Sequence, residues 1–391
     1  MGLKAMWVSP AMWTATGYGV QSKRTVPRLQ QLPEVDYIGI ACNSGLSYGG
    51  VKYAGVEHWP LWGITASDVA LRSHLAVSGC DTVFTLLDVW VLSNDFATKD
   101  AKGNRFRWLP YAPIDAWPLS MENYAQLVKA DIVLVNSYFG KLVCEDAGLS
   151  DVRYMPHMVD TELYKPKSDH QTYKQRYLGF PNDSFVVGMV AANKGRTPMR
   201  KGFEFALRAF AAFAQKHDDA FLYLHTDLMP SSSENADLFR IINLYGLKDK
   251  ARGLDPYTAT MGVGDDEMVG IYNSFDVVLS ASRAESCNVP LLEGQSCGVP
   301  VVGSKTSGQT EHIGVGWSVE CLTQELTPQA SHWEVPDWKG LAEALELSYQ
   351  YLSVKSKKKA MRKKAREFAL NFDSDTVCQT YWSPLIKELA G

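Results

Sequence analysis

The chain has 391 residues, of which 46% are hydrophobic and 11% aromatic, so it can bury a large apolar core. This composition excludes global disorder, and the length suits two domains better than one. The formal charge of -4 lacks the basic excess of a dedicated nucleic-acid-binding protein.

Short apolar or β-branched runs alternate with longer helix-like stretches along the chain. This alternation is typical of strand-helix-strand units around a buried parallel sheet, so the predicted fold class is α/β. In the first half it predicts strands at 5–9, 37–41, 82–87, 108–113 and 132–136. In the second half it predicts strands at 185–191, 220–225, 275–280 and 299–303, with an amphipathic helix at 203–217. We therefore expect two such sheets.

The boundary between the two domains is expected near residues 156–166, PHMVDTELYKP, where prolines bracket a polar turn. This places one domain at 1–160 and the other at 161–374. A final amphipathic helix, at about 375–391, is expected to pack back on the first domain. The basic stretch 354–368, VKSKKKAMRKKAREF, has helix-forming composition. We interpret it first as a solvated helix face, with an acidic membrane surface or an acidic acceptor as the alternative partner.

The loop after the strand at 275–280 contains two glutamates. It reads SRAESCNVPLLEGQSCGVPVVG, with seven residues between Glu285 and Glu293. Open parallel sheets bind ligands at the carboxyl ends of their strands. If a helix starts near Asn288, both carboxylates can face one end of a cleft, one holding ribose hydroxyls and the other donor-sugar hydroxyls. The alternative is that both are ordinary exposed acids near a helix start, where the helix dipole favours them.

The first loop of the second domain is rich in cations. It reads ANKGRTPMRKGFEFALRAF and contains Asn193, Arg196, Arg200 and Lys201 immediately before an amphipathic helix. Helix amides together with arginine and lysine side chains form a site for a diphosphate. Because basic loops are common, this pattern alone indicates such a site only weakly.

In the first domain, a glycine loop and two aspartates follow strands. The loop TATGYGV at 14–20 contains Gly17 and Gly19, which permit close approach of a ligand to the backbone. A dinucleotide fingerprint fits poorly, because Ser22 stands where its third glycine belongs. Asp88 and Asp115 each follow a strand and could simply cap a helix or turn. Otherwise, Asp115 orients or deprotonates an acceptor hydroxyl, and the sequence leaves open whether Asp88 does so instead.

The two loops of the second domain closely resemble the donor-binding signature of retaining glycosyltransferases of family four. The matching residues are Ser282, Glu285, Pro290, Glu293, Gly298, Pro300, Val301 and Val302, and Lys201-Gly202 matches the family's helix-opening pair. The connector and the segment ADIVLVNSYFGK also resemble the family, so the likeness runs from about residue 10 to about 345. It implies the GT-B architecture, two Rossmann-like doubly wound domains facing across a cleft.

The resemblance also assigns roles to residues. It implies that Arg200 or Arg196 joins Lys201 at the diphosphate, with Arg200 favoured, and that the loop of Gly17 and Gly19 approaches the donor from the other domain. Asn193, Ser286 and Asn288 are expected among the donor contacts. The family usually has Gly-Phe-Gly after its first glutamate, whereas here Ser286, Cys287 and Asn288 follow Glu285. Asn288 tolerates a positive φ, which would preserve the turn. Asp115 stands where the family often carries a histidine.

The resemblance implies a retaining glycosyltransferase that moves a sugar from a nucleotide diphosphate sugar, such as a UDP or GDP sugar, to an acceptor hydroxyl. Arg200 and Lys201 would stabilise the leaving diphosphate, so we expect no metal and no cofactor. The acceptor could be a glycan, a lipid-linked sugar, a small molecule or a modified nucleic acid. A sugar-nucleotide epimerase and a non-catalytic nucleotide-sugar-binding protein remain alternatives.

The cysteines and the apolar segments indicate the cellular compartment in which the protein is expected. Seven widely spaced cysteines, with no Cys-x-x-Cys pair, indicate reduced thiols in a cytoplasmic protein rather than a metal site. No apolar stretch approaches the length of a membrane span, and the N-terminus lacks the pattern of a signal peptide. The basic stretch still allows peripheral contact with a membrane.

Overall fold

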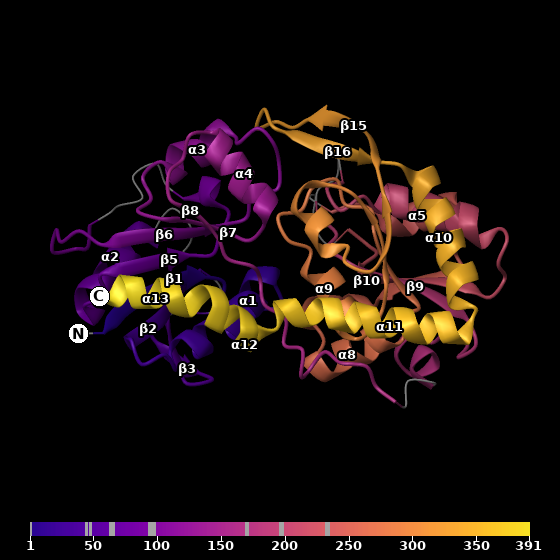
Figure 1. The fold of residues 1–391 in the computed structure, drawn as a ribbon, viewed down its shortest axis with the longest axis horizontal. Coiled ribbons are helices and arrows are strands. Elements are labelled where there is room, and N and C mark those ends of the chain that lie inside the picture. The colour runs from indigo at the N-terminus through magenta and orange to yellow at the C-terminus, as the bar shows by residue number, and fades with distance from the viewer. Residues whose placement is uncertain are drawn as a thin grey trace. The chain divides into compact units, whose positions relative to one another are not determined.

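The structure is a computed structural model that describes residues 2–43, 46, 49–61, 67–92, 99–168, 172–194, 199–230 and 235–391. Its contacts divide the chain into two compact units (Figure 1). Unit 1 comprises Met1–Met158, Thr327–Ser331 and Phe372–Gly391, and unit 2 comprises Val159–Leu326 and His332–Asn371. The first break thus falls inside the proline-bracketed connector.

Unit 1 is built on a sheet of eight strands in the order β3-β4-β2-β1-β5-β6-β7-β8. Neighbouring strands are parallel except β3, which is antiparallel to β4. The chain starts at β1 and builds the sheet outward in both directions, which is doubly wound topology. The strands are β1 (Leu3–Ser9), β2 (Val35–Cys42), β3 (Val51–Tyr53), β4 (Val56–Pro60), β5 (Thr82–Thr85), β6 (Arg107–Ala112), β7 (Val133–Val135) and β8 (Val152–Tyr154).

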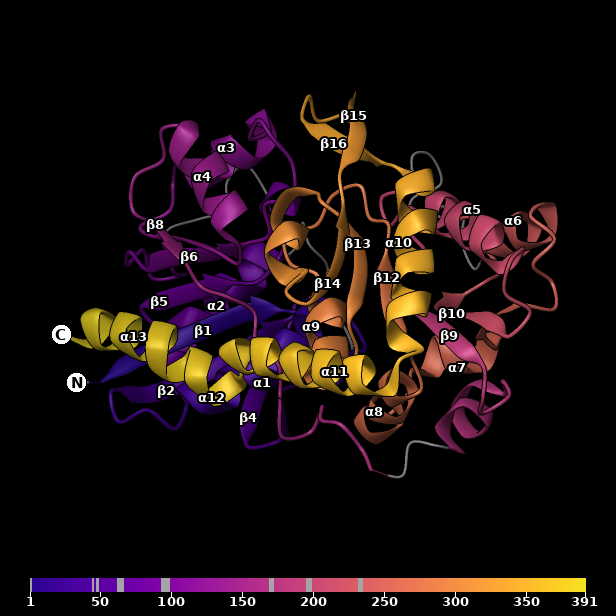
Figure 2. The same cartoon turned by 45° about the vertical axis from the view of Figure 1, so that its right-hand side comes forward.

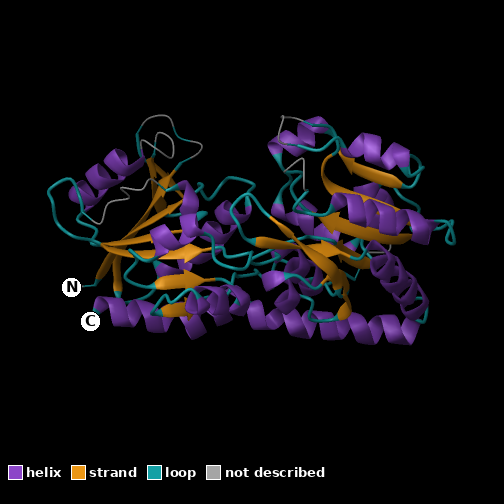
Figure 3. Ribbon diagram, turned by 90° about the horizontal axis from the view of Figure 1, so that it is seen from above, coloured by secondary structure: helices purple, strands orange, loops and turns teal. Residues whose placement is uncertain are grey.

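Helices cover both faces of this sheet, as expected for parallel strands that are buried on each side (Figure 3). The helices of unit 1 are α1 (Gly17–Leu29), α2 (Ser67–Ser78), α3 (Met121–Leu127), α4 (Tyr138–Asp146), α12 (Ser374–Val377) and α13 (Ser383–Ala390). A 3-10 turn η1 (Val89–Val91) follows β5, and a π-helical turn η6 (Cys378–Trp382) joins α12 to α13.

The C-terminal helices belong to the core of unit 1 through Trp382. Its ring is fully buried, with ring centroids 5.6 Å from Trp7, 6.0 Å from Phe84 and 5.5 Å from Tyr111. These three partners lie on β1, β5 and β6, at the centre of the sheet. Burial of such large aromatic side chains fixes the C-terminal segment against strands formed more than two hundred residues earlier.

Unit 2 contains a six-stranded parallel sheet in the order β11-β10-β9-β12-β13-β14. This is the strand order of a dinucleotide-binding Rossmann sheet, with its topological switch point between β9 and β12. The strands are β9 (Phe185–Val190), β10 (Ala220–Asp227), β11 (Ala251–Leu254), β12 (Val277–Ser280), β13 (Val301–Ser304) and β14 (Gly316–Val319).

Seven α-helices accompany this sheet in the described part of unit 2. They are α5 (Phe203–Ala214), α6 (Leu238–Leu244), α7 (Pro256–Met261), α8 (Asp265–Asn273), α9 (Val289–Ser296), α10 (Trp338–Leu352) and α11 (Lys355–Ala369). Shorter turns are η3 (Lys174–Leu178), η4 (Ser307–His312) and η5 (Leu370–Phe372). A separate antiparallel hairpin, β15 (Cys321–Leu326) with β16 (His332–Pro336), precedes α10 (Figure 2).

All nine predicted strands and the predicted helix at 203–217 are present with shifted ends. The helix ends at Ala214, and the strand expected at 275–280 begins only at Val277. The pattern missed β3, β4, β8, β11 and β14, which lie at or near the edges of the two sheets, and it missed the hairpin. Edge strands are short and paired on one side, so they lack the continuous apolar run that marks a central strand.

The basic stretch forms a helix, α11, as its composition indicated. No helix in the described ranges has both the length and the apolar character needed to cross a bilayer.

Candidate functional site

The carboxyl ends of β9 and β12 mark the place where unit 2 is expected to bind a ligand. The connections from these adjacent strands leave in opposite directions, so the sheet has its switch point here, and doubly wound sheets bind ligands beyond the strand ends at such a point. The loop after β9 carries Arg200 and Lys201, and the loop after β12 carries Glu285. We call residues 281–288 the donor loop. Topology alone therefore brings the predicted cations and the first predicted glutamate to one edge of the sheet.

Gly202 lets these two loops approach each other closely. It precedes α5 with φ of 64°, in the left-handed region. A Cβ atom at this position would lie 1.8 Å from the carbonyl oxygen of Ala281, a contact that no side chain can make. The Arg283 amide also donates to the Arg200 carbonyl at 2.8 Å. The glycine of the Lys-Gly pair is therefore required by the packing of the two loops, and it places Lys201 directly before the helix.

Glu285 lies in a buried polar cluster. Its Oε1 accepts from Lys201 Nζ at 2.5 Å and from Ser282 Oγ at 2.9 Å, and its Oε2 accepts from Arg200 Nη1 at 3.2 Å. Arg200 Nη1 also donates to the Ala284 carbonyl at 2.9 Å. Burial alone would raise the pKa of Glu285, but the ammonium of Lys201 and the guanidinium of Arg200 lower it below its ordinary value. Glu285 is therefore a carboxylate locked against two cations.

Glu293 lies in the middle of α9, which begins at Val289 as the sequence suggested. Its side chain is buried, and Oε2 accepts a hydrogen bond from Tyr272 Oη of α8 at 2.7 Å. Burial, followed by the nearby Glu293 charge, raises the pKa of Tyr272 well above its ordinary value, so this phenol remains a donor. The two glutamates thus take different partners, Glu285 the cations and Glu293 a tyrosine that sequence reasoning did not single out.

Asn288 does not adopt the positive φ expected for it; its φ is -98°. The expectation was wrong because the residue holds the turn through its side chain instead. Asn288 Nδ2 donates to Ser280 Oγ at 3.0 Å and to Gln309 Oε1 at 2.6 Å. Ser286, which stands in place of the family's first turn glycine, is also buried. The altered turn is therefore supported by buried polar side chains.

Asn193 is held by the protein rather than aimed out of it. Its amide donates to the carbonyls of Asp227 and Ala236, and its Oδ1 accepts from the Ala236 amide at 3.1 Å. These bonds tie the start of the basic loop to the segment after β10. Arg196 lies outside the described residues, so its predicted role is not addressed by the structure. A donor contact from either residue stays a prediction.

The residues predicted in unit 1 lie at the carboxyl edge of its sheet. Gly19 is in the first turn of α1, where a Cβ would lie 2.3 Å from Thr14 Oγ1, whereas a Cβ on Gly17 would meet nothing within 4 Å. Asp88 accepts from Tyr18 Oη at 3.0 Å. Asp115 follows β6 and is half-buried. Gly19 is therefore fixed by packing, and Gly17 leaves its backbone open to approach.

His157 is a buried residue of the same unit. Its Nδ1 lies 2.7 Å from Tyr111 Oη and its Nε2 lies 3.1 Å from Asn136 Nδ2. Both ring nitrogens are thus engaged within the protein.

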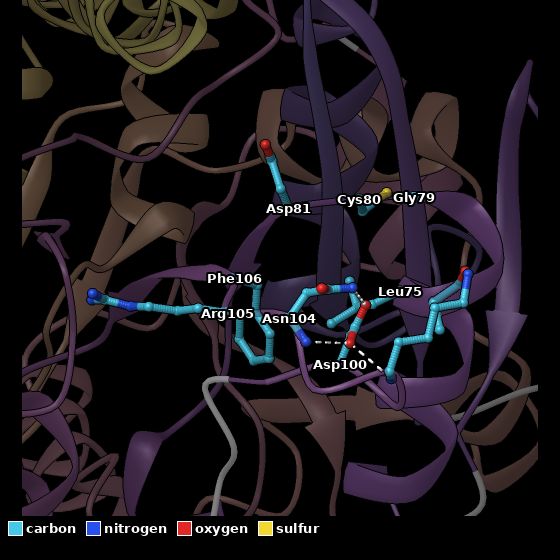
Figure 4. A pocket seen from close by; sticks show the side chains of 10 residues that line it. Leu75, Gly79, Cys80, Asp81, Asp100, Asn104, Arg105 and Phe106 are labelled. Carbon is cyan, nitrogen blue, oxygen red and sulfur yellow. Dashed lines mark hydrogen bonds between the residues drawn. The ribbon is translucent and has the colours of Figure 1, made fainter.

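A separate cavity of about 160 Å³ in unit 1 lies at the wrong edge of the sheet for such a site. Its walls come from the end of α2 and from the residues just before β5 and β6, so it opens at the amino ends of the strands (Figure 4). Asp100 accepts there from Asn104 within the same turn. Arg105 donates to Asp131 at 2.5 Å. In the parts of the chain that the structure describes, no group of three or more His, Cys, Asp or Glu side chains could hold a metal ion.

Comparison with known proteins gives a family match to part of the chain. Residues 186–345 match the family model described as Glycosyl transferases group 1. D-inositol 3-phosphate glycosyltransferase of Corynebacterium jeikeium is 32% identical over 167 residues, which cover 42% of this chain and 38% of that protein. The chain thus spans less than half of the length of the curated relatives it matches.

Solved structures match over almost the whole chain. Sucrose-phosphate synthase from Thermosynechococcus elongatus has a TM-score of 0.77 with 17% identity, covering 99% of each chain. Anabaena Alr3699/HepE in complex with UDP-glucose has a TM-score of 0.71 with 18% identity, covering 98% of this chain and 100% of that one. At these identities the likeness establishes the fold and carries no substrate with it.

Proposed function

We propose that the protein is a retaining glycosyltransferase, because residues 186–345 match the group 1 glycosyl transferases and the chain has the GT-B fold. It takes a sugar from a nucleotide diphosphate sugar and transfers it to an acceptor hydroxyl. The observation that carries the proposal is the cluster of Lys201, Arg200 and Glu285 at the switch point of the second sheet.

The cations of this cluster suit a leaving group that gains negative charge. Lys201 precedes Gly202, the N-cap residue of α5, and its ammonium contacts Glu285 at the edge of the sheet where that helix begins. Arg200 adds a planar guanidinium, which matches phosphate oxygens. Together they stabilise charge on the departing diphosphate, and on this basis we propose that the reaction needs neither a metal ion nor a cofactor.

The two glutamates are assigned to the sugars of the donor. Glu285, kept ionised by its cations, accepts hydrogen bonds from hydroxyls of the transferred sugar. Glu293, held by Tyr272, accepts from the ribose hydroxyls. Carboxylates fixed by buried partners lose little conformational freedom on binding, which strengthens each hydroxyl contact.

The comparisons indicate which donor and acceptor to test first. A UDP or GDP sugar is the proposed donor, and the UDP-glucose complex of the HepE neighbour makes UDP-glucose the first one to test. The curated relatives are inositol-phosphate glycosyltransferases by name, which makes an inositol phosphate the first acceptor to test. Asp115, half-buried after β6, is proposed to orient or deprotonate the acceptor hydroxyl.

We also propose a reducing, cytoplasmic setting with peripheral contact at an anionic membrane. All seven cysteines are free thiols, and five of them are buried. Helix α11 carries exposed lysines at positions 355, 357, 359, 363 and 364, whereas Lys358 turns inward to Asp276. An exposed cationic face of this kind attracts anionic headgroups by about 1 kcal/mol per lysine.

A thermal-shift titration with UDP and GDP sugars tests the donor site. Binding to the native state raises the melting temperature, so wild-type protein should shift with at least one donor. Lys201→Ala and Glu293→Ala each remove a charged contact, and we expect donor affinity to fall about tenfold to a hundredfold in each variant. The matched control is Lys248→Ala, which removes an exposed cation of unit 2 and should leave the shift unchanged.

Turnover is then followed as release of the nucleoside diphosphate with and without acceptor. The anomeric configuration of the product tests retention, and activity in the presence of a chelator tests independence from metal. Equal donor-induced thermal shifts in wild type and in both site variants would refute the assignment of Lys201 and Glu293 to the donor site. Conversion of the donor alone into an isomer, without any acceptor, would replace the transferase by an epimerase.

A further inference from the structure

The end of β13 and the segment that follows it lie along the donor loop and contact five of its residues. We call the side chains of Ser304, Thr306, Ser307, Gln309 and His312 the brace. Ser304 Oγ donates to the Ser282 carbonyl at 2.8 Å, and Thr306 Oγ1 donates to the Arg283 carbonyl at 2.6 Å. These bonds hold the loop from the side opposite to Arg200 and Lys201. The donor loop is therefore clamped between the basic loop and the brace.

Ser307 makes the most specific contact of the brace. Its hydroxyl accepts from the Glu285 amide at 2.9 Å and donates to the Glu285 carbonyl at 2.8 Å. The Ser307 hydroxyl thus satisfies both the amide and the carbonyl of Glu285, the residue that contacts the cations. Ser307 has φ of 36°, a left-handed conformation that is unusual for a residue with a side chain. Such strain persists where the surrounding contacts over-determine it, and it concentrates at functional sites.

Gln309 and His312 hold the altered turn after Glu285. Gln309 is fully buried and accepts from Asn288 Nδ2 and from Ser280 Oγ, each at 2.6 Å, while its own amide donates to the Ser304 carbonyl at 2.7 Å. His312 Nε2 lies 3.6 Å from Cys287 Sγ. Burial lowers the pKa of His312 to about 4, so the ring is neutral at physiological pH.

We propose that the brace positions the donor loop, with Ser307 as the positioning residue that fixes the backbone of Glu285. The inference rests on the proposed donor site and adds residues to it that neither the family signature quoted above nor the comparisons assign. Its physical basis is preorganisation: a carboxylate contributes to binding in proportion to how firmly its own backbone is held. Ser307 contacts the amide and the carbonyl of Glu285, so the proposed role acts through that residue.

Two substitutions at one position separate the hydroxyl from the backbone conformation. Ser307→Ala removes both hydrogen bonds and keeps the strained φ, whereas Ser307→Gly removes both bonds and relieves the strain. If the hydroxyl positions the loop, both variants should raise the donor Kd and KM about tenfold while kcat falls less. A purely structural role would lower the fraction of folded enzyme, and with it kcat, without raising KM.

Hydrogen exchange supplies a readout that needs no substrate. The Glu285 amide donates to Ser307 Oγ, so its exchange in ligand-free protein should speed up in both variants. Thr310→Ala is the matched control, because Thr310 is an exposed hydroxyl residue of the same short helix, η4, and should leave exchange and KM unchanged.

The outcomes of these experiments distinguish the positioning role of Ser307 from the proposed glycosyltransferase function. Unchanged Glu285 exchange and unchanged donor affinity in Ser307→Ala would overturn the positioning role. Loss of affinity in Ser307→Ala but full retention in Ser307→Gly would also overturn it, because the backbone turn alone would then matter. If wild-type protein binds no nucleotide sugar at all, the proposed function fails, while the exchange experiment still decides whether Ser307 holds the loop.

Discussion

Replacement of Asp276 by asparagine tests the electrostatic anchor of the strand that carries the donor loop. Asp276 lies just before β12 and is 4% exposed. Its carboxylate accepts from Lys174 and Lys358, each at 2.6 Å, and from the Val186 amide of β9 at 2.9 Å. One buried side chain thus joins β9, η3 and α11. Asparagine keeps the shape and the amide contact but removes the charge that both lysines face.

The expected loss of stability follows from the pKa of the Asp276 carboxyl. Burial works to raise the pKa of Asp276, but the two lysines overcome it and hold the pKa at about 2, below its ordinary value of 3.8. That difference corresponds to about 2 to 3 kcal/mol of stability at neutral pH. Removal of one partner of a buried pair costs about 3 to 5 kcal/mol. We expect about 3 kcal/mol for Asp276→Asn, because Lys358, with 35% of its side chain exposed, can turn to water.

The direction of the pKa shift determines how the stability contribution of Asp276 changes with pH. Because the folded pKa is depressed, the contribution is complete above the unfolded pKa and is lost as the pH falls from about 4 through about 2. The stability gap between wild type and Asp276→Asn should therefore narrow by about 1 kcal/mol between pH 7 and pH 3. Urea unfolding measures it without the ionic screening that guanidinium would introduce. The exposed Asp249→Asn serves as control and should change stability little.

A variant as stable as wild type at pH 7 would refute this reasoning. So would a gap that stays constant from pH 7 to pH 3, since the loss would then come from packing rather than from charge.

Two further predictions concern unit 2. Gly202→Ala forces a Cβ against the Ala281 carbonyl, so the donor loop must move; we expect donor-induced thermal shifts to be lost and the ligand-free melting temperature to fall by a few degrees. Gly264→Ala, where a Cβ meets nothing within 4 Å, should keep the donor-induced thermal shift. Lys359→Glu should weaken co-sedimentation with phosphatidylglycerol vesicles by about tenfold or more, whereas Lys248→Glu should not, and phosphatidylcholine vesicles should bind neither wild type nor variant. Equal binding of the two lysine variants would remove the membrane proposal.

The central part of each sheet could be predicted from the sequence because its strands are buried on both faces. FVVGMV at 185–190 is a continuous apolar run, and such a run has few interpretations in a chain of alternating elements. The strands that escaped prediction include VRY at 152–154 and ARGL at 251–254, which contain charged residues and lie at sheet edges. Their pairing is decided by the neighbouring strand, which a local pattern does not contain.

The candidate site was predictable to the extent that topology dictates it. Strand order sets the switch point, and the switch point brings the loops after β9 and β12 together, so Lys201 and Glu285 could be placed at one edge before their contact at 2.5 Å was known. The role of Asn193 was harder to foresee. An asparagine in a basic loop suits a ligand contact and a loop clamp equally, and only the position of Ala236 decides that its side chain is engaged by the protein.

The brace shows why local sequence patterns could not predict the rest of the site. Ser307 and Gln309 follow a later strand, and in sequence they read as an ordinary polar turn. Their importance arises because β12 and β13 are neighbours, so the turns after both strands meet at one edge. The turn after Glu285 departs from the family pattern, and the side chains that hold it come from that neighbouring turn. The change from the family pattern in the donor loop is thus compensated by side chains of the turn after β13. This argument predicts that changes at Asn288 and Gln309 are energetically coupled, so a double-mutant cycle on donor affinity should deviate from additivity.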